Sequence, residues 1–144
     1  MTDRAYAASA DIGGPPDAVW AALVDGSSWA SWDSSVDAVE GRFGPGATVT
    51  IRSKVAPGRA FPVTVTVFDP PRAMVFSGGL PLGLFRGVRT YRLAPSGAGT
   101  KFEMREEYSG PLAALMFRSI PDLGPSFTQF VNGLKTLVER TAAN

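Results

Sequence analysis

The pattern of apolar residues changes its period once along the chain, and this change most constrains the fold. Over residues 36–109, apolar and polar residues alternate in short segments, as in strands with one buried face. In the last third, apolar residues recur about every 3.6 residues, which is the period of a helix. The sequence therefore predicts an antiparallel sheet followed by a C-terminal helix.

The residues before this sheet predict one strand and two short helices. Residues 6–12 alternate as a strand does. A helix then begins at residues 15–17, Pro-Pro-Asp, because proline is tolerated in a first helical turn and an acidic residue is favoured there. That helix ends near Gly26, and a second short helix is predicted over residues 27–35.

Six further strands and a long helix complete the predicted fold. Pro121 and Pro125 split the C-terminal helix, whose second piece runs from about residue 125 to 140. We predict a single α+β domain over residues 1–144, in which a curved antiparallel sheet of about seven strands and the long helix enclose a cavity. The six strands are predicted over residues 36–41, 47–52, 63–67, 73–78, 86–94 and 100–109.

The last two predicted strands form a hairpin around a four-residue loop, residues 96–99. Residues two apart on a strand point to the same face. If Pro95 lies opposite Thr100, the inward-facing pairs are Leu93 with Phe102, Tyr91 with Met104, and Arg89 with Glu106. The residues that alternate with this inward set, Glu103, Arg105 and Glu107, are therefore expected to face solvent.

Composition excludes several classes of chemistry. The chain has no His and no Cys, so it has no Ser-His-Asp triad, imidazole shuttle, cysteine nucleophile or zinc finger. Its formal net charge is +1, which gives no strong field for nucleic acid. Residues 41–46 are glycine-rich but lack the features of a phosphate loop. Asp33, Asp37 and Glu40 are expected on a solvated surface rather than at a metal, and we expect no cofactor.

No segment indicates export or membrane insertion. The first residues include Asp3, Arg4 and Asp11, which do not form the core of a signal peptide. No apolar run approaches the roughly 20 residues that span a bilayer. We expect a cytoplasmic protein without stable membrane insertion, and the sequence leaves its oligomeric state open.

Four short motifs and the final helix carry a family resemblance. The motifs are Pro-Pro-Asp-Ala-Val-Trp at 15–20, Trp-Ala-Ser-Trp-Asp at 29–33, Arg-Thr-Tyr-Arg-Leu at 89–93 and Gly-Thr-Lys-Phe at 99–102. Over nearly the whole chain the sequence resembles the START-like helix-grip (SRPBCC) superfamily, and within it the bacterial polyketide cyclase/dehydrase and lipid-transport family. The resemblance implies a cavity lined by the inner sheet face and the last helix. It also implies a cavity mouth near residues 80–85 and 112–117.

Arg89 and Glu106 are the leading candidates for a polar site. A guanidinium inside a cavity needs a carboxylate or a ligand anion, because an unpaired buried charge costs several kcal/mol. In the functional interpretation, Arg89 binds a ligand carboxylate, enolate or phenolate, and Glu106 and Tyr91 assist. The same three residues are the catalytic candidates. In the alternative interpretation, the pair is a structural ion pair or lies at the surface.

Aromatic and aliphatic residues supply the candidate lining of the cavity. Trp29 and Trp32 form a wall of the cavity or anchor the second helix on the sheet. The apolar loops at 80–85 and 112–117 suit the capture of an apolar ligand, or pack on each other. The other lining candidates, each with ordinary core packing as the alternative, are Phe76, Phe85, Met104, Met116, Phe127, Phe130 and Leu134.

These observations predict the binding of a hydrophobic or aromatic small molecule, lipid-like or polyketide-like, by a carrier or sensor. The first alternative is a polyketide cyclase, dehydratase or aromatase. Without His, such an enzyme would rely on Arg89, Tyr91 and Glu106 for polarisation and proton transfer. The second alternative is a partner-binding domain with a filled core.

Overall fold

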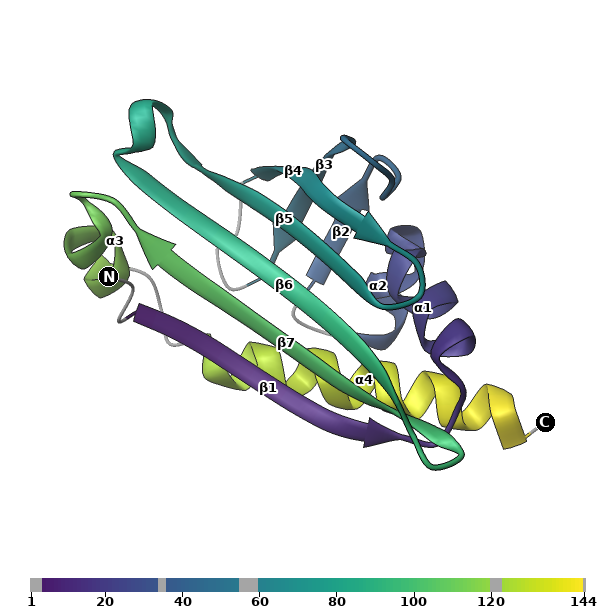
Figure 1. Ribbon diagram of the computed structural model, residues 1–144. Coiled ribbons are helices and arrows are strands. Elements are labelled where there is room, and N and C mark those ends of the chain that lie inside the picture. The colour runs from purple at the N-terminus through teal and green to yellow at the C-terminus, as the bar shows by residue number, and fades with distance from the viewer. Residues whose placement is uncertain (1–3, 34–35, 55–59, 120–122, 144) are drawn as a thin grey trace.

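The computed structural model describes residues 4–33, 36–54, 60–119 and 123–143. Within these residues, seven strands form one antiparallel sheet in the order β1-β7-β6-β5-β4-β3-β2 (Figure 1). The strands are β1 (Arg4–Ile12), β2 (Val36–Glu40), β3 (Thr48–Ser53), β4 (Ala60–Asp69), β5 (Ala73–Leu80), β6 (Phe85–Ser96) and β7 (Gly99–Ser109). The helices are α1 (Pro16–Val24), α2 (Trp29–Trp32), α3 (Ala113–Ser119) and α4 (Gly124–Ala143), with 3-10 turns η1 (Gly26–Ser28) and η2 (Pro81–Gly83).

The helices begin and end close to where the sequence places them. Pro16 is the first residue of α1 and Asp17 follows in its first turn. The C-terminal helical region is divided as predicted, because α3 ends at Ser119 and α4 begins at Gly124. Pro125 lies in the first turn of α4, where a missing N–H costs no hydrogen bond, and Pro121 lies outside the described residues.

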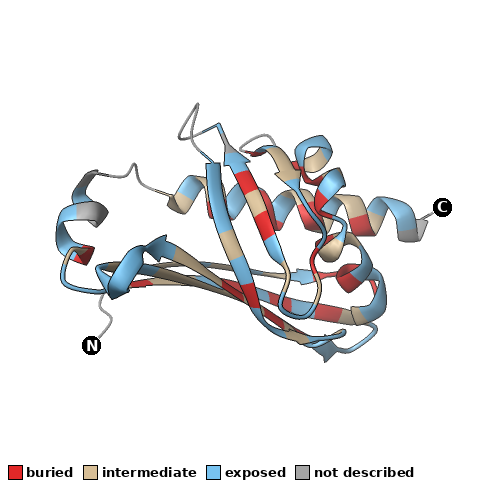
Figure 2. Cartoon of the chain, turned by 90° about the horizontal axis from the view of Figure 1, so that it is seen from above, coloured by how far each residue is buried: buried red, intermediate tan, exposed pale blue. Residues whose placement is uncertain are grey.

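Helix α4 lies along one face of the sheet (Figures 1 and 2). Two contacts attach it to the end of β1. The Nζ of Lys135 donates a hydrogen bond to the carbonyl oxygen of Asp11 at 2.8 Å, and the N–H of Gly13 donates to Glu139 at 2.9 Å. Hydrogen bonds from Lys135 and Gly13 lower the pKa of Glu139. The side of α4 that faces the sheet carries the buried residues Phe127, Phe130, Val131, Leu134 and Val138.

Helix α2 packs directly on α4 because a glycine faces it. A Cβ atom at Gly133 would clash with the carbonyl oxygen of Trp32. The absent side chain therefore allows the backbone of α2 to lie against α4, and this contact holds the Trp29–Trp32 segment over the sheet.

The alternation in β4 is interrupted by a bulge. The register between β4 and β5 shifts by one residue between Val65 and Val67. Val65 is buried, whereas Val67 is 44% exposed. Phe68 takes the inward position beyond the bulge, where its ring lies 5.3 Å from that of Trp20.

The predicted register of the β6–β7 hairpin is confirmed. Arg89 lies opposite Glu106, and Tyr91 lies opposite Met104. The predicted four-residue loop is wrong, because Ser96 also pairs with Gly99 and only two residues form the turn. Gly97 has a φ of 61°, which a tight hairpin turn requires and glycine adopts without strain.

The expectation that the acidic group Asp33, Asp37 and Glu40 is solvated is wrong for Asp33. Asp33 directly follows Trp32, whose backbone lies against Gly133 of α4, and Asp33 is 1% exposed. Its backbone N–H donates to the carbonyl of Trp29 at 2.8 Å. Asp37 and Glu40 are exposed, and Glu40 pairs with Arg52 at 3.0 Å.

The described residues contain no cluster of three or more potential metal-ligating side chains. None of their helices is long and apolar enough to cross a membrane.

Candidate functional site

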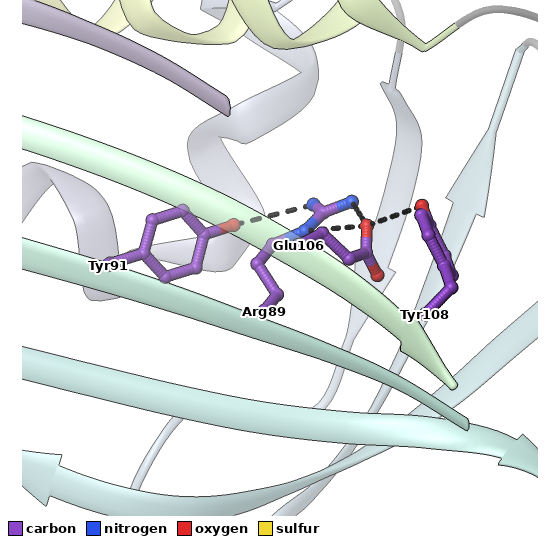
Figure 3. A network of polar contacts seen from close by, with 4 residues as sticks. All are labelled: Arg89, Tyr91, Glu106 and Tyr108. Carbon is purple, nitrogen blue, oxygen red and sulfur yellow. Dashed lines mark hydrogen bonds and ion pairs between the residues drawn. The ribbon is translucent and has the colours of Figure 1, made fainter. Parts of the chain in front are cut away.

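Four side chains of β6 and β7 form a polar network on the inner face of the sheet, composed of Arg89, Tyr91, Glu106 and Tyr108 (Figure 3). Arg89 donates from Nη2 to Oε2 of Glu106 at 2.7 Å and from Nε to the same oxygen at 3.2 Å. Tyr108 donates its hydroxyl to that oxygen at 3.1 Å. Nη1 of Arg89 donates to the hydroxyl of Tyr91 at 3.5 Å. The ion pair of the alternative interpretation is therefore present.

Two aromatic rings cover the guanidinium of Arg89. The ring centre of Phe76 on β5 lies 5.5 Å from its central carbon, and that of Phe127 on α4 lies 4.8 Å away. These distances are within the range of cation–π attraction. The side chains of Arg89 and Glu106 nevertheless remain 18% and 14% exposed. The pair is thus shielded by apolar rings while part of its surface stays accessible.

Burial and the ion pair with Glu106 shift the pKa of Arg89 in opposite directions. Burial by itself lowers the pKa of Arg89, but the carboxylate of Glu106 and the hydroxyl of Tyr91 hold it above its ordinary value. Burial raises the pKa of Tyr91 to about 12, although Arg89 opposes this rise. Burial and the charge of Glu106 raise the pKa of Tyr108 as well. Near neutral pH, both tyrosines are hydrogen-bond donors and Arg89 is a permanent cation.

Three residues of the site were not among the predicted ones. Tyr108 lies two positions after Glu106 on the same face, so extending the predicted alternation would have found it. Tyr6 lies opposite Glu106 in the β1–β7 pairing, with its ring 5.9 Å from that of Phe127. No local signal in the sequence reports that pairing. Gly87 lies opposite Tyr108, and a Cβ there would come within 3.3 Å of Oε1 of Glu106.

Several predicted lining residues lie in one buried cluster, here called the closed cluster, together with Phe102. Its members are Trp29, Tyr91, Phe102, Met104, Phe130 and Leu134. The indole N–H of Trp29 donates to the carbonyl of Leu23 at 2.9 Å, and its ring lies 4.8 Å from that of Phe130. This geometry fits the anchoring interpretation of Trp29. Trp32 is half-buried at the edge of the cluster and donates to the hydroxyl of Ser28 at 3.1 Å.

The two predicted rim segments lie together at one end of the sheet (Figure 1). The N–H of Leu112 donates to the carbonyl of Leu84 at 2.9 Å, so their backbones are in contact. Their apolar side chains still face solvent, since Leu82 is 96% exposed and Leu115 is 58% exposed. The side chain of Met116, a predicted lining residue, lies outside the described part of the chain.

Phe85 links this end to the polar network, because its ring stacks on that of Tyr108 at 5.8 Å with an interplanar angle of 11°. A pocket of about 220 Å³ lies next to Phe85. Its described lining residues are Ser77, Gly78, Gly79, Leu80, Gly83, Phe85 and Arg86.

The curled sheet with a long helix across its inner face is the helix-grip fold, a fold in which sheet and helix face each other around the site described above. A family model described as polyketide cyclase / dehydrase and lipid transport matches residues 4–139. The chain belongs to that family. A comparison with curated proteins finds no significant match.

Solved structures agree on the fold at low sequence identity. ZhuI aromatase/cyclase from Streptomyces sp. R1128 is similar with a TM-score of 0.75 and 17% identity, over 96% of this chain and 95% of that chain. A hypothetical protein from Helicobacter pylori gives a TM-score of 0.78 and 14% identity, over 95% and 89% of the two chains. Protein MLL2253 from Mesorhizobium loti gives a TM-score of 0.72 and 21% identity, over 96% of this chain and 98% of that chain. The family supports a ligand-binding or polyketide-related function, and these neighbours show the fold.

Proposed function

We propose that this protein binds a hydrophobic or aromatic small molecule, lipid-like or polyketide-like, on the inner face of its sheet. The apolar body of the ligand lies against Phe85 and Tyr108, and its polar end reaches the polar network. Within this proposal the chain is a single-domain carrier or sensor in the bacterial cytoplasm. Binding needs no cofactor and no nucleic acid.

One observation carries this proposal: the Arg89–Glu106 ion pair is enclosed by apolar rings but remains partly accessible. Ligand sites are typically apolar surfaces with a few convergent polar groups, and this arrangement has that composition. Partial exposure lowers the desolvation cost of the pair and also leaves part of it within reach of a ligand. The exposed apolar residues Leu80 and Leu84 at the adjoining end of the sheet offer further contact area to an apolar ligand.

The first experiment is native mass spectrometry of the protein purified from its own cells, with the masses of released molecules recorded. A stoichiometric apolar adduct would support the proposal and give the chemical class of the ligand. In parallel, the purified protein is titrated with prodan, an uncharged naphthalene whose fluorescence reports an apolar environment. We expect saturable one-to-one binding.

Variants locate the prodan site. Gly87→Ala and Gly87→Val place a methyl or larger group beside Glu106 and Tyr108, and we expect at least a tenfold loss of prodan affinity for the valine variant. The matched control is Gly44→Val, because a Cβ at Gly44 meets no atom within 4 Å. Circular dichroism and the melting temperature check that each variant folds. An unchanged affinity in both Gly87 variants, or no saturable binding by the wild type, would refute the proposal. A clean apo mass in addition would favour the partner-binding alternative.

A second candidate function is a cyclase, dehydratase or aromatase, favoured by the two tyrosine hydroxyls that flank the ion pair. The hydroxyl groups of Tyr91 and Tyr108 stay protonated at neutral pH. A substrate carbonyl that took the place of Glu106 at the hydroxyl of Tyr108 would receive its hydrogen bond, while the carboxylate of Glu106 could accept a proton. Arg89→Ala separates the two functions, assayed with an aromatic polyketide precursor. Retained affinity with lost turnover would support an enzyme, and lost affinity would support a carrier.

A further inference from the structure

The hydrogen-bonding capacity of Arg89 is largely used within the protein. Three of its five N–H groups donate to Glu106 and Tyr91. Its guanidinium also lies against the rings of Phe76 and Phe127. Its charge is balanced by the carboxylate of Glu106 at 2.7 Å. Two N–H groups remain, but a ligand anion at this position would compete with Glu106 for a charge that is already balanced.

Glu106 is used unequally at its two oxygens. Oε2 accepts the hydrogen bonds from Nε and Nη2 of Arg89 and from the hydroxyl of Tyr108. Oε1 accepts none from the described residues. Within that part of the chain no buried side-chain nitrogen or oxygen atom lacks a hydrogen-bond partner, so Oε1 lies on accessible surface.

Gly87 explains why this oxygen is left uncovered. It is the neighbour of Arg89 on the inner face of β6, opposite Tyr108, and it has no side chain. A Cβ at this position would lie 3.3 Å from Oε1 of Glu106 and 3.4 Å from the ring of Tyr108. Any larger side chain would therefore extend over the carboxylate. The group that the network presents to a ligand is thus a hydrogen-bond acceptor with negative charge.

We propose that the site selects ligands whose polar end donates a hydrogen bond, such as an alcohol or a phenol, and discriminates against carboxylates. This inference rests on the proposed function. A hydroxyl group would form a charge-assisted hydrogen bond to Oε1, the stronger kind of hydrogen bond. A carboxylate would place like charge beside Oε1 and leave it without a donor, which is a specific penalty against that ligand. Arg89 then orients Glu106 instead of binding the ligand itself.

Three naphthalenes of matched size test this selection by isothermal titration at neutral pH: 1-naphthol, 1-methoxynaphthalene and 1-naphthoate. Naphthol carries a donor, the methyl ether carries none and naphthoate is an anion. We expect naphthol to bind roughly tenfold tighter than the methyl ether, as one charge-assisted hydrogen bond allows. We expect naphthoate to bind weakest.

Glu106→Gln should reverse this order. Its amide oxygen can accept from Arg89 while its NH₂ group takes the place of Oε1, so an acceptor becomes a donor and the positive charge of Arg89 is no longer balanced. The advantage of naphthol is then lost and naphthoate gains affinity. Glu103→Gln is the matched control on the same strand, because Glu103 is exposed and alternates with the inner set. Gly87→Ala is a second variant, which crowds Oε1 and leaves the ion pair in place.

The outcomes separate the two proposals. If none of the three naphthalenes binds, the proposed function fails and the selection fails with it. If all bind but naphthoate binds as tightly as naphthol, the selection is refuted and ligand binding stands. An unchanged order in Glu106→Gln, or an equal change in Glu103→Gln, would also refute the selection, because the preference would not then come from Oε1.

Discussion

Strand β6 crosses two regions of the same sheet face that differ in how they are covered. At one end, Tyr91 and Leu93 are 0% and 4% exposed and pack within the hydrophobic core. At the other end, Phe85 and Gly87 are half-buried, and Arg89 lies between the two regions. Because residues two apart share a face, all five positions point to the same side of the sheet. The difference in burial therefore comes from what lies over the strand.

Helix α4 accounts for this difference. Phe127, in its first turns, lies over Arg89, and the later residues Phe130 and Leu134 cover the closed cluster. Trp29 on α2 adds a second layer at the same end. The helix begins at Gly124, only three residues before Phe127. The polar network thus lies at the boundary between a dry core and an accessible surface, where a charged pair can be shielded and still reach a ligand.

The largest expected effect tests whether the two regions differ in stability. Trp29→Ala should reduce the free energy of unfolding by about 3–5 kcal/mol, because it removes a fully buried ring from the closed cluster. Phe85→Ala should cost roughly 1 kcal/mol, since that ring is only half-buried. Urea denaturation measures both values. Equal losses would contradict the division of the face into a closed and an accessible region.

The next effect comes from Tyr91, which belongs both to the polar network and to the closed cluster. Its pKa is raised to about 12 in the folded protein and is about 10 in the unfolded chain, so the contribution of Tyr91 is complete below pH 10. As pH rises from 10 to 12 the unfolded chain loses this proton and the folded protein keeps it. The free energy of unfolding then falls by about 2–3 kcal/mol.

Absorbance of tyrosinate near 295 nm follows this titration, and Tyr91→Phe supplies the control. The variant should lack the ionisation step near pH 12 and should lose less stability between pH 10 and 12. A wild-type protein with every tyrosine titrating near 10 would show that Tyr91 is not enclosed as described.

The smallest effect tests the boundary itself. Arg89→Met leaves the partly buried carboxylate of Glu106 without its cation, and we expect a loss of about 1–2 kcal/mol, reduced from the fully buried case by partial exposure. The double variant Arg89→Met with Glu106→Leu should recover most of this loss. Arg52→Met is the control, because its pair with Glu40 is about half exposed and should contribute less than about 0.5 kcal/mol. A deficit in the double variant as large as in Arg89→Met would contradict the pairing.

Much of the site could be predicted because it lies on one hairpin. The pairing of Arg89 with Glu106 follows from a short hairpin loop, with Pro95 opposite Thr100, and from alternation, both of which are local in the sequence. The same alternation extends to Tyr108, which the prediction stopped short of. Tyr6 could not be found in this way, because β1 pairs with β7 across most of the chain and no turn sets that register.

The role of the apolar residues could not be predicted for a different reason. Phe85 and Phe130 both have the spacing of buried residues, yet one is half-buried and the other is 3% exposed. Hydrophobic spacing reports which face of an element is apolar and does not report where a neighbouring element ends. The bulge in β4 likewise exchanges Val67 for Phe68 on the inner face without a clear signal in the alternation.

The sequence by itself determined the order of strands and helices, the division of the C-terminal helical region and the register of the last hairpin. These depend on periodicity, proline and glycine, which act within a few residues of the chain. Only the tertiary structure decided that Asp33 is buried, that Tyr6 joins the site and that one oxygen of Glu106 is left uncovered. These properties depend on which atoms from distant segments come to lie over a residue, and burial is set by those neighbours rather than by the residue itself.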